Sequence, residues 1–222
     1  MTPSATITPT SAEKLLGGWV HQDLKWANHI LEGNDSLVKS LNTRLSALKL
    51  VGRVASFKTR KVIADGIFMS KLVYLISLWG GSEKYLMRSL QTIQNKVARV
   101  VTKLGWDTPT EVLLTQCGWL SVQQLAYHHT VVLVHKILQS GHPRYLHNLF
   151  NMDYRVKTRQ ADQQLLKPSQ IEVPDHELVT DSFRWRALQN WNALPLQLRT
   201  ISNAVNFKKQ VKMWIKKNTP LR

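Results

Sequence analysis

Residues 191–199 read WNALPLQLR, and this stretch decides how the C-terminal part of the chain is organised. Leu194 stands directly before Pro195 and Trp191 four residues before it, and two more leucines follow. Proline interrupts a helix because it lacks a backbone N–H and its ring crowds the preceding turn. The stretch therefore predicts a junction between two helices, with Trp191 and Leu194 in the core.

Helical signals flank this junction on both sides. Ser182 is predicted to cap the helix that leads to Pro195, and Ser202 the helix that follows. Apolar residues at four-, seven- and eight-residue spacings predict the buried stripe of that last helix. This stripe consists of Phe207, Val211, Trp214 and Ile215.

Further helices are predicted upstream, where polar capping residues precede apolar stripes. They begin at Asp35 or Ser36, at Ser56, at Ser82, at the Thr108–Glu111 capping box and at the Ser121–Gln124 capping box. The helix from Ser56 is expected to continue to Gly80. Near the N-terminus, Gly17 and Gly18 interrupt short apolar pieces, which predicts a hairpin with a close backbone approach. The predicted class is mainly α, a helical bundle with a small β-hairpin near the N-terminus.

Four regions are expected along the chain. Residues 1–33 form a lead-in and the hairpin, and residues 34–150 form the main helical domain. Residues 151–181 are polar, contain two prolines and show weak periodicity, which predicts a linker or long loop. Residues 182–222 form a basic C-terminal helical segment.

The charge of the chain is strongly positive. Thirty Lys and Arg residues stand against 14 Asp and Glu, which gives a formal net charge of +16 and a pI of about 10.2. Such a bias favours a polyanionic partner, with nucleic acid first and an anionic membrane surface second. The alternative is a soluble basic protein without such a partner.

The basic residues are concentrated in three segments that hold no acid. Seven lie between Asp35 and Asp65, five between Glu83 and Asp107, and nine in the 41 residues after Asp181. Solvated helix faces usually mix both signs, so these segments favour binding to phosphate over an ordinary charged surface. Because no pattern of Asn, Gln and Arg suggests base readout, sequence-independent backbone contacts are expected.

Charge density then selects the candidate contacts. They are Arg53, Lys58, Arg60, Lys61, Arg88, Lys96, Arg99, Lys208, Lys209 and Lys212.

No reaction centre is predicted. Two-metal polymerases and nucleases need clustered carboxylates, whereas the acids here are scattered, with no Asp-Asp pair. His128, His129 and His135 fall on different helix faces, so structural or surface roles are favoured over a metal site. No cofactor is expected.

The compartment is expected to be reducing. The single Cys117 lies among apolar neighbours, which favours a buried structural thiol. No signal peptide is visible, and Asp65 and Lys71 interrupt the most apolar stretch, which argues against a membrane span. An intracellular location, nuclear or cytoplasmic, is expected.

Several motifs occur together in an order typical of one family. They are LLGGWVHQDLKWANHI (residues 15–30), LVYLISLWGG (72–81), LQTIQNKVARVV (90–101), CGWLSV (117–122), HPRYLHNLF (142–150) and WNALPLQLR followed by FKKQVKMWI (207–215). This arrangement resembles the C-terminal part of reverse transcriptases from jockey-like non-LTR retrotransposons. The resemblance covers about residues 14–217.

The resemblance implies a thumb and a C-terminal extension of an RNA-directed DNA polymerase. The family's palm, with its Asp-Asp metal site, lies before the segment that resembles residues 15–30, so no catalysis is expected from this chain alone. The turn at Gly17 and Gly18 would correspond to the primer grip. The helices that follow would hold a template–primer duplex, either an RNA–DNA hybrid or duplex DNA.

Other roles remain open. The chain could be a domesticated, stand-alone nucleic-acid-binding protein. It could also be an interaction protein that pairs with a separately encoded palm. Membrane-surface binding through the basic, amphipathic last helix is a further alternative.

Overall fold

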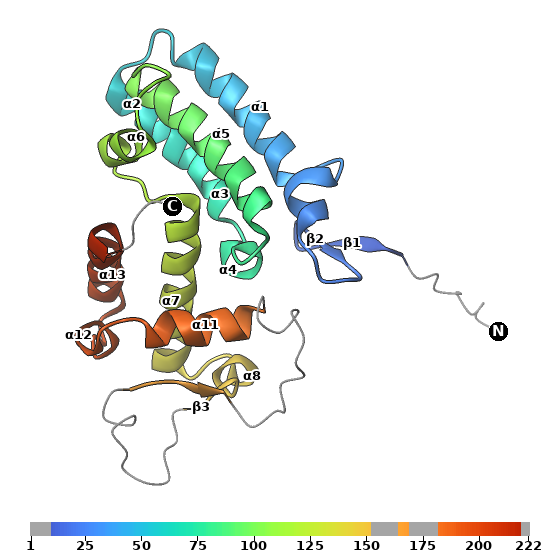
Figure 1. Ribbon diagram of the computed structural model, residues 1–222, viewed down its shortest axis with the longest axis vertical. Helices are drawn as coiled ribbons and strands as arrows, with labels where there is room; N and C mark the ends of the chain where they lie inside the picture. Colours follow the sequence, from blue (N-terminus) through green and yellow to red (C-terminus); the bar gives the residue numbers. More distant parts are fainter. Residues whose placement is uncertain (1–9, 152–163, 169–181, 219–222) are drawn as a thin grey trace, which may run out of the picture.

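The computed structural model describes residues 10–151, 164–168 and 182–218 (Figure 1). Their fold is mainly helical, with a two-stranded antiparallel hairpin near the N-terminus, which confirms the predicted class. The expected lead-in at residues 1–9 and most of the expected linker lie outside the described residues.

The hairpin joins β1 (Ala12–Leu15) to β2 (Gly18–His21). Leu15 pairs with Gly18, so Leu16 and Gly17 form a two-residue turn. Both have positive φ, 48° at Leu16 and 82° at Gly17. Turns of this kind match the twist of the flanking strands and favour glycine. A short π-helical segment, η1 (Asn28–Glu32), then leads into the helices.

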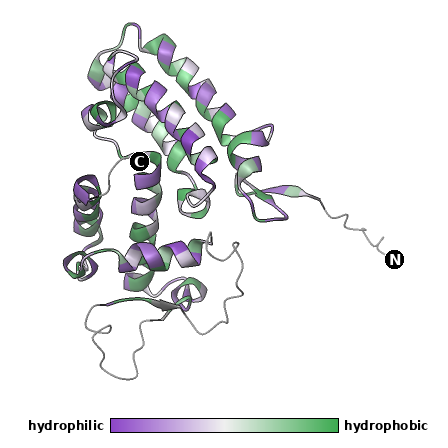
Figure 2. Cartoon of the chain, viewed as in Figure 1, coloured by the Kyte–Doolittle hydropathy of each residue, from purple (hydrophilic) through white to green (hydrophobic). Residues whose placement is uncertain are grey.

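Three helical runs form the first layer. α1 (Leu37–Val51) buries Leu37, Leu41, Leu45 and Leu48. The second run contains α2 (Phe57–Ile63), η2 (Ala64–Met69), α3 (Ser70–Val73) and α4 (Ile76–Trp79). α5 (Lys84–Thr102) returns beside α1 and packs against it. Figure 2 shows hydrophilic and hydrophobic residues alternating along these helices, as expected for helices with one buried face.

The predicted continuous helix from Ser56 to Gly80 is wrong. The chain leaves helical geometry at Tyr74, and Leu75 has a φ of 58°. The freed carbonyl of Tyr74 accepts a hydrogen bond from the indole Nε1 of Trp79 (2.9 Å). The break also lets Leu75 pack against the hairpin at Gly18, a tertiary contact that local spacing does not encode.

α6 (Thr110–Cys117) and α7 (Val122–Ser140) follow, and α7 is the central helix of the lower half in Figure 1. The capping box of Ser121 and Gln124 is confirmed. The box predicted at Thr108 is wrong, because Pro109 takes the N-cap position and α6 has no side-chain cap. The predicted cap at Ser82 is also wrong, because its hydroxyl donates to the carbonyl of Trp79 instead.

The C-terminal part packs on α7. α8 (Arg144–His147) and the short pair β3 (Phe150–Asn151) and β4 (Lys167–Pro168) lie near its end. α11 (Phe183–Asn192), α12 (Leu196–Arg199) and α13 (Ala204–Asn218) then wrap around it. α11 and α13 both contact α7.

Trp191 and Leu194 of the junction lie in the core, as predicted. Trp191 is 2% exposed and Leu194 is 1% exposed. The indole of Trp191 lies 6.0 Å from the ring of Phe207 on α13, measured between centroids, and its Nε1 donates to the carbonyl of Gln164 (3.1 Å). Pro195 is the N-cap of α12. The stretch therefore fixes α13 against the rest of the bundle.

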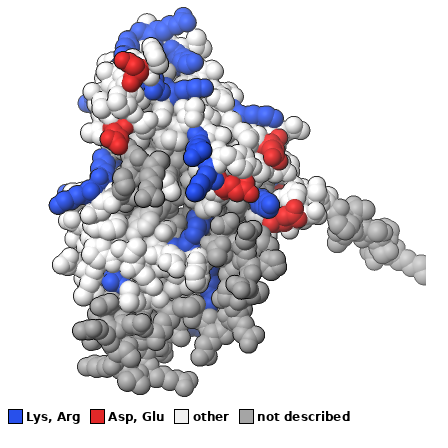
Figure 3. All heavy atoms as spheres, viewed as in Figure 1, with Lys and Arg blue, Asp and Glu red and all other residues white. Residues whose placement is uncertain are grey.

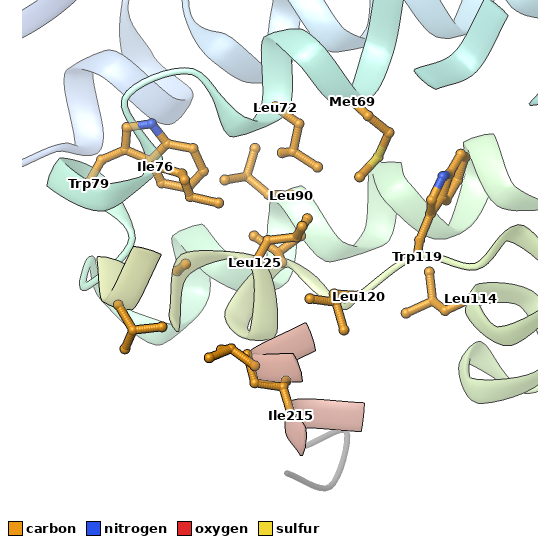
Figure 4. Close-up of a cluster of buried hydrophobic side chains, with 14 of the residues drawn as sticks. Met69, Leu72, Ile76, Trp79, Leu90, Leu114, Trp119, Leu120, Leu125 and Ile215 are labelled. Atoms are coloured by element: carbon orange, nitrogen blue, oxygen red, sulfur yellow. The ribbon is translucent and has the colours of Figure 1, made fainter. Parts of the chain in front are cut away.

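One apolar core connects these layers. Figure 4 shows Met69, Leu72 and Ile76 from the second helical run facing Leu90 of α5 and Leu125 of α7. Ile215 of α13 belongs to the same core. The helices that carry the basic residues are thus held in fixed relative positions.

The N-terminus of α13 offers a test of the local structure. Asn203, not the predicted Ser202, is the cap, because its Oδ1 accepts the backbone N–H of Asn206 (2.9 Å). We expect Asn203→Ala to lower the free energy of unfolding by about 0.5–2 kcal/mol. Ser202→Ala should change it by less than about 0.5 kcal/mol. Urea unfolding of both variants makes the comparison, and an equal loss for Ser202→Ala would contradict this assignment.

Candidate nucleic-acid interface

A row of lysines runs along one side of α13. Lys208, Lys212 and Lys216 are spaced by four residues, so they lie on the same side of the helix. Their position follows from the apolar stripe beside them, since Phe207, Val211 and Ile215 are fully buried. We call these three residues the α13 lysine row. Lys209 is also exposed, on the next face of the helix.

Lys61 of α2 brings a fourth cation to the α13 lysine row. Its Nζ forms an ion pair with the carboxylate of Asp65 (2.6 Å), whose other oxygen accepts the indole N–H of Trp119 (2.7 Å). Asp65 is thus held by two partners from different elements. Partial burial, and then the nearby charges of Lys216, Lys61 and Lys208, lower the pKa of Lys212, and Asp65 opposes them.

This clustering of like charges has an energetic consequence. Four lysines, three of them exposed and Lys61 half-buried, lie near one carboxylate, so the repulsion that Lys212 feels from the other three is incompletely balanced. An anion placed there would relieve it. The area made by Lys61 and the α13 lysine row is therefore suited to a phosphate group.

A second basic area runs along α5. Its cations fall within roughly a third of the helix circumference, opposite the buried stripe from Leu86 to Val101. We call them the α5 basic stripe. It consists of Lys84, Arg88, Lys96, Arg99 and Lys103.

The members of the α5 basic stripe differ in how free their side chains are. Arg88 and Lys96 are exposed. Arg99 is half-buried, and its Nη2 donates to the carbonyls of Trp106 (2.9 Å) and Thr108 (3.4 Å). Arg99 therefore supports the loop after α5, in addition to contributing charge to the stripe.

The turn between α1 and α2 carries Arg53, and the first turn of α2 carries Lys58; both are exposed. Figure 3 shows Lys and Arg side chains at this upper end of the molecule. The prediction that Arg60 contacts phosphate is wrong, because this side chain is only 5% exposed. Its Nε donates to the carbonyl of Val101 (2.8 Å) and its Nη1 to that of Ala55 (2.5 Å). Arg60 thus joins α2 to the end of α5 and is withdrawn as a candidate phosphate contact.

The hairpin glycines lie at the opposite end of α1 from this turn. Gly17 occupies the turn at positive φ, and the hydroxyl of Tyr74 donates to the carbonyl of Leu16 beside it. Gly18 is buried, and a Cβ there would lie 2.9 Å from Cδ1 of Leu75. Both glycines are thus explained by turn geometry and close packing.

The structure therefore brings some predicted residues together and separates others. Lys61 joins Lys208 and Lys212, although about 150 residues separate them in the sequence. The hairpin that carries Gly17 and Gly18 lies apart from the connection between α1 and α2 (Figure 1). Sequence reasoning missed Lys216, which the four-residue spacing from Lys208 and Lys212 could have found.

A second group of cations that was not predicted lies near the hairpin. Lys14 pairs with Asp35 (3.0 Å), and Lys71 lies over the ring of Tyr74 (5.7 Å from its centroid). Partial burial, and then the charges of Arg44 and Lys14, lower the pKa of Lys71. No local pattern marks these residues, because the docking of the hairpin brings them together.

The histidines of α7 hold the C-terminal helices in place. Nε2 of His128 lies 3.2 Å from the carbonyl of Lys208, and Nε2 of His135 lies 2.6 Å from that of Ile201. His135 also stacks on Phe207, with centroids 4.0 Å apart. These contacts confirm the predicted structural role. Within the described residues, no group of three or more His, Cys, Asp or Glu side chains is arranged to hold a metal ion.

Cys117 is fully buried, as predicted. Burial raises the pKa of its thiol to about 11, which disfavours the reactive thiolate.

Buried histidines should make the fold sensitive to acid. Burial lowers the pKa of both His29 and His128 from 6.5 to about 4. Between pH 6.5 and 4 the unfolded chain therefore binds protons that the folded chain does not. The free energy of unfolding consequently decreases as the pH is lowered through this range. The loss should reach about 1 kcal/mol per pH unit for each histidine, and should level off below pH 4.

The check is the urea midpoint at pH 7.5 and at pH 5. His128→Gln keeps an N–H that can reach the carbonyl of Lys208 and removes the titration, so its midpoint should depend less on pH. Exposed His142→Gln is the matched control and should behave like the wild type. An unchanged pH dependence in His128→Gln would contradict the assignment.

We found no match to the chain among protein-family models, curated proteins or solved structures. None of the helices in the described part of the chain combines the length and apolarity that crossing a membrane requires.

Proposed function

We propose that this chain binds nucleic acid through the sugar–phosphate backbone, as the thumb and C-terminal region of a non-LTR retrotransposon reverse transcriptase would hold a template–primer duplex. The observation that carries the proposal is the convergence of Lys61 with the α13 lysine row. Helices from two distant parts of the chain place four lysines close enough to repel one another, around a single carboxylate, and this arrangement favours a bound phosphate.

The α5 basic stripe supports the same function. It extends over 19 residues of helix, or about 28 Å at 1.5 Å per residue. Phosphates along one strand of a duplex recur at intervals of several ångströms, so a row of that length can contact several of them. Both basic areas consist mainly of Lys, which binds phosphate as a point charge without reading bases.

The family assignment within the proposal rests on the order of the sequence motifs. The junction at residues 191–199 is one of these motifs, and its Trp191 and Leu194 anchor a basic helix. The role proposed for these residues is binding, and no catalytic role is assigned to them.

The experiment is fluorescence anisotropy with a labelled RNA–DNA hybrid at salt concentrations from 50 to 200 mM. We expect the logarithm of the association constant to fall linearly with the logarithm of the salt concentration, with a slope that reflects several phosphate contacts. Absence of binding at 50 mM salt would overturn the proposal.

A further inference from the structure

The loop between α5 and α6 exposes a tryptophan. All eight tryptophans lie in the described part of the chain, and Trp106 is the exposed one, at 87%. The other seven are buried or half-buried. An exposed indole offers a large, flat apolar surface with a polar N–H, which suits it to contact with a partner.

The backbone that carries Trp106 is well anchored. Its carbonyl accepts a hydrogen bond from Nη2 of Arg99 (2.9 Å), and the N–H of Thr108 donates to the carbonyl of Gly105 (3.3 Å). Lys103 ends α5 in a left-handed conformation, and its N–H still bonds to the carbonyl of Arg99 (2.8 Å). The indole is thus exposed from a supported loop.

Cations approach this loop from two directions. Lys96, Arg99 and Lys103, the last members of the α5 basic stripe, lead to it along α5. The start of α2, with Lys58 and with Arg53 in the turn before it, packs against the same end of α5, as the bond from Arg60 to the carbonyl of Val101 shows. The partner should therefore be anionic and present a flat apolar face to the indole.

We infer that Trp106 is a stacking platform for an unpaired base, at the end of a nucleic acid whose phosphates lie along the α5 basic stripe. This inference rests on the proposed function and adds a preference for a junction between a duplex and a single strand. Every base offers a flat face, so the contact requires no particular sequence. Bases inside a duplex are already stacked on their neighbours, and an unpaired base is free to bind.

The test compares a blunt RNA–DNA hybrid with the same hybrid carrying a short single-stranded overhang. A third substrate carries an overhang of abasic nucleotides, which keeps the phosphates and removes the bases. We expect wild-type protein to bind the normal overhang more tightly than either other substrate. Trp106→Ala should reduce affinity for the normal overhang by about 5- to 100-fold and change affinity for the blunt hybrid by less than about twofold.

Trp106→Phe is the matched control, because it retains an aromatic face and should recover most of the lost affinity. Equal binding of wild type and Trp106→Ala to the normal overhang would overturn this inference, as would full binding to the abasic overhang. Trp106-dependent binding to anionic phospholipid vesicles, without an effect on nucleic acid, would also overturn it and assign the loop to a membrane surface. Absence of wild-type binding to all three substrates would overturn the proposed function itself.

Discussion

Replacing Trp191 by alanine is expected to lower the free energy of unfolding by about 3–5 kcal/mol. The side chain is 2% exposed and lies between α7 and α13, with its ring 6.4 Å from His135 and 6.0 Å from Phe207. Alanine would leave a cavity at this junction. It would also leave the carbonyl of Gln164 without the indole hydrogen bond.

The measurement is urea unfolding at pH 7.5, with Trp106→Ala as the control of the same residue type. Because Trp106 is 87% exposed, its replacement should change stability by less than about 0.5 kcal/mol. The free energy of unfolding of Trp191→Phe should lie between those of the wild type and Trp191→Ala, because phenylalanine keeps an aromatic ring and lacks the indole N–H. A loss below 1 kcal/mol for Trp191→Ala would contradict the role of residues 191–199 as the anchor of α13.

Neutralising the α13 lysine row is expected to weaken binding to an RNA–DNA hybrid by about tenfold or more at 150 mM salt. The variant is Lys208→Gln, Lys212→Gln and Lys216→Gln combined. Each lost phosphate contact should also make the salt dependence shallower by about one unit of slope. The fold should persist, because the buried stripe of Phe207, Val211 and Ile215 is unchanged.

A control variant separates this local effect from the loss of overall charge. Lys25, Lys39 and Lys136 are exposed and lie outside the two basic areas, so their combined replacement by Gln removes the same charge. It should weaken binding by less than about threefold, through the general field of the protein. Equal losses in both variants would show that net charge alone, and not the α13 lysine row, determines binding.

Much of the fold follows from local pattern. Ser36, Ser56 and Ser182 cap helices as predicted, because the hydroxyl of each accepts the backbone N–H three residues on. Trp191 and Leu194 were identifiable as core residues from their position before Pro195. In these places local preference and tertiary packing agree.

The predictions that were wrong have a common cause, which is tertiary packing. The break at Leu75 depends on contact with the hairpin, and the turn of Ser82 toward Trp79 depends on the chain reversal before α5. Arg60 has no local signal for burial, since its partners are the carbonyls of Ala55 and Val101. A lysine or arginine in a basic segment can serve as a structural crosslink, and sequence spacing does not distinguish this use.

The candidate interface was predicted only as a list of charged segments. The three acid-free segments indicated which helices are basic, and the four-residue spacing on α13 indicated one side of it. The meeting of Lys61 with Lys212 could not be predicted, because it depends on how α13 packs on α7. The exposure of Trp106 could not be predicted from its loop context alone, since Trp119 also follows a glycine in a loop and is buried.

The most direct test of the proposed function compares the affinities of the wild-type chain for an RNA–DNA hybrid, duplex DNA, single-stranded RNA and single-stranded DNA at 150 mM salt. The thumb-like role predicts measurable binding, with the hybrid bound most tightly. Equal affinity for all four nucleic acids would contradict that role and favour a stand-alone basic binding protein. No binding to any of them would contradict nucleic-acid binding as the function of these basic helices.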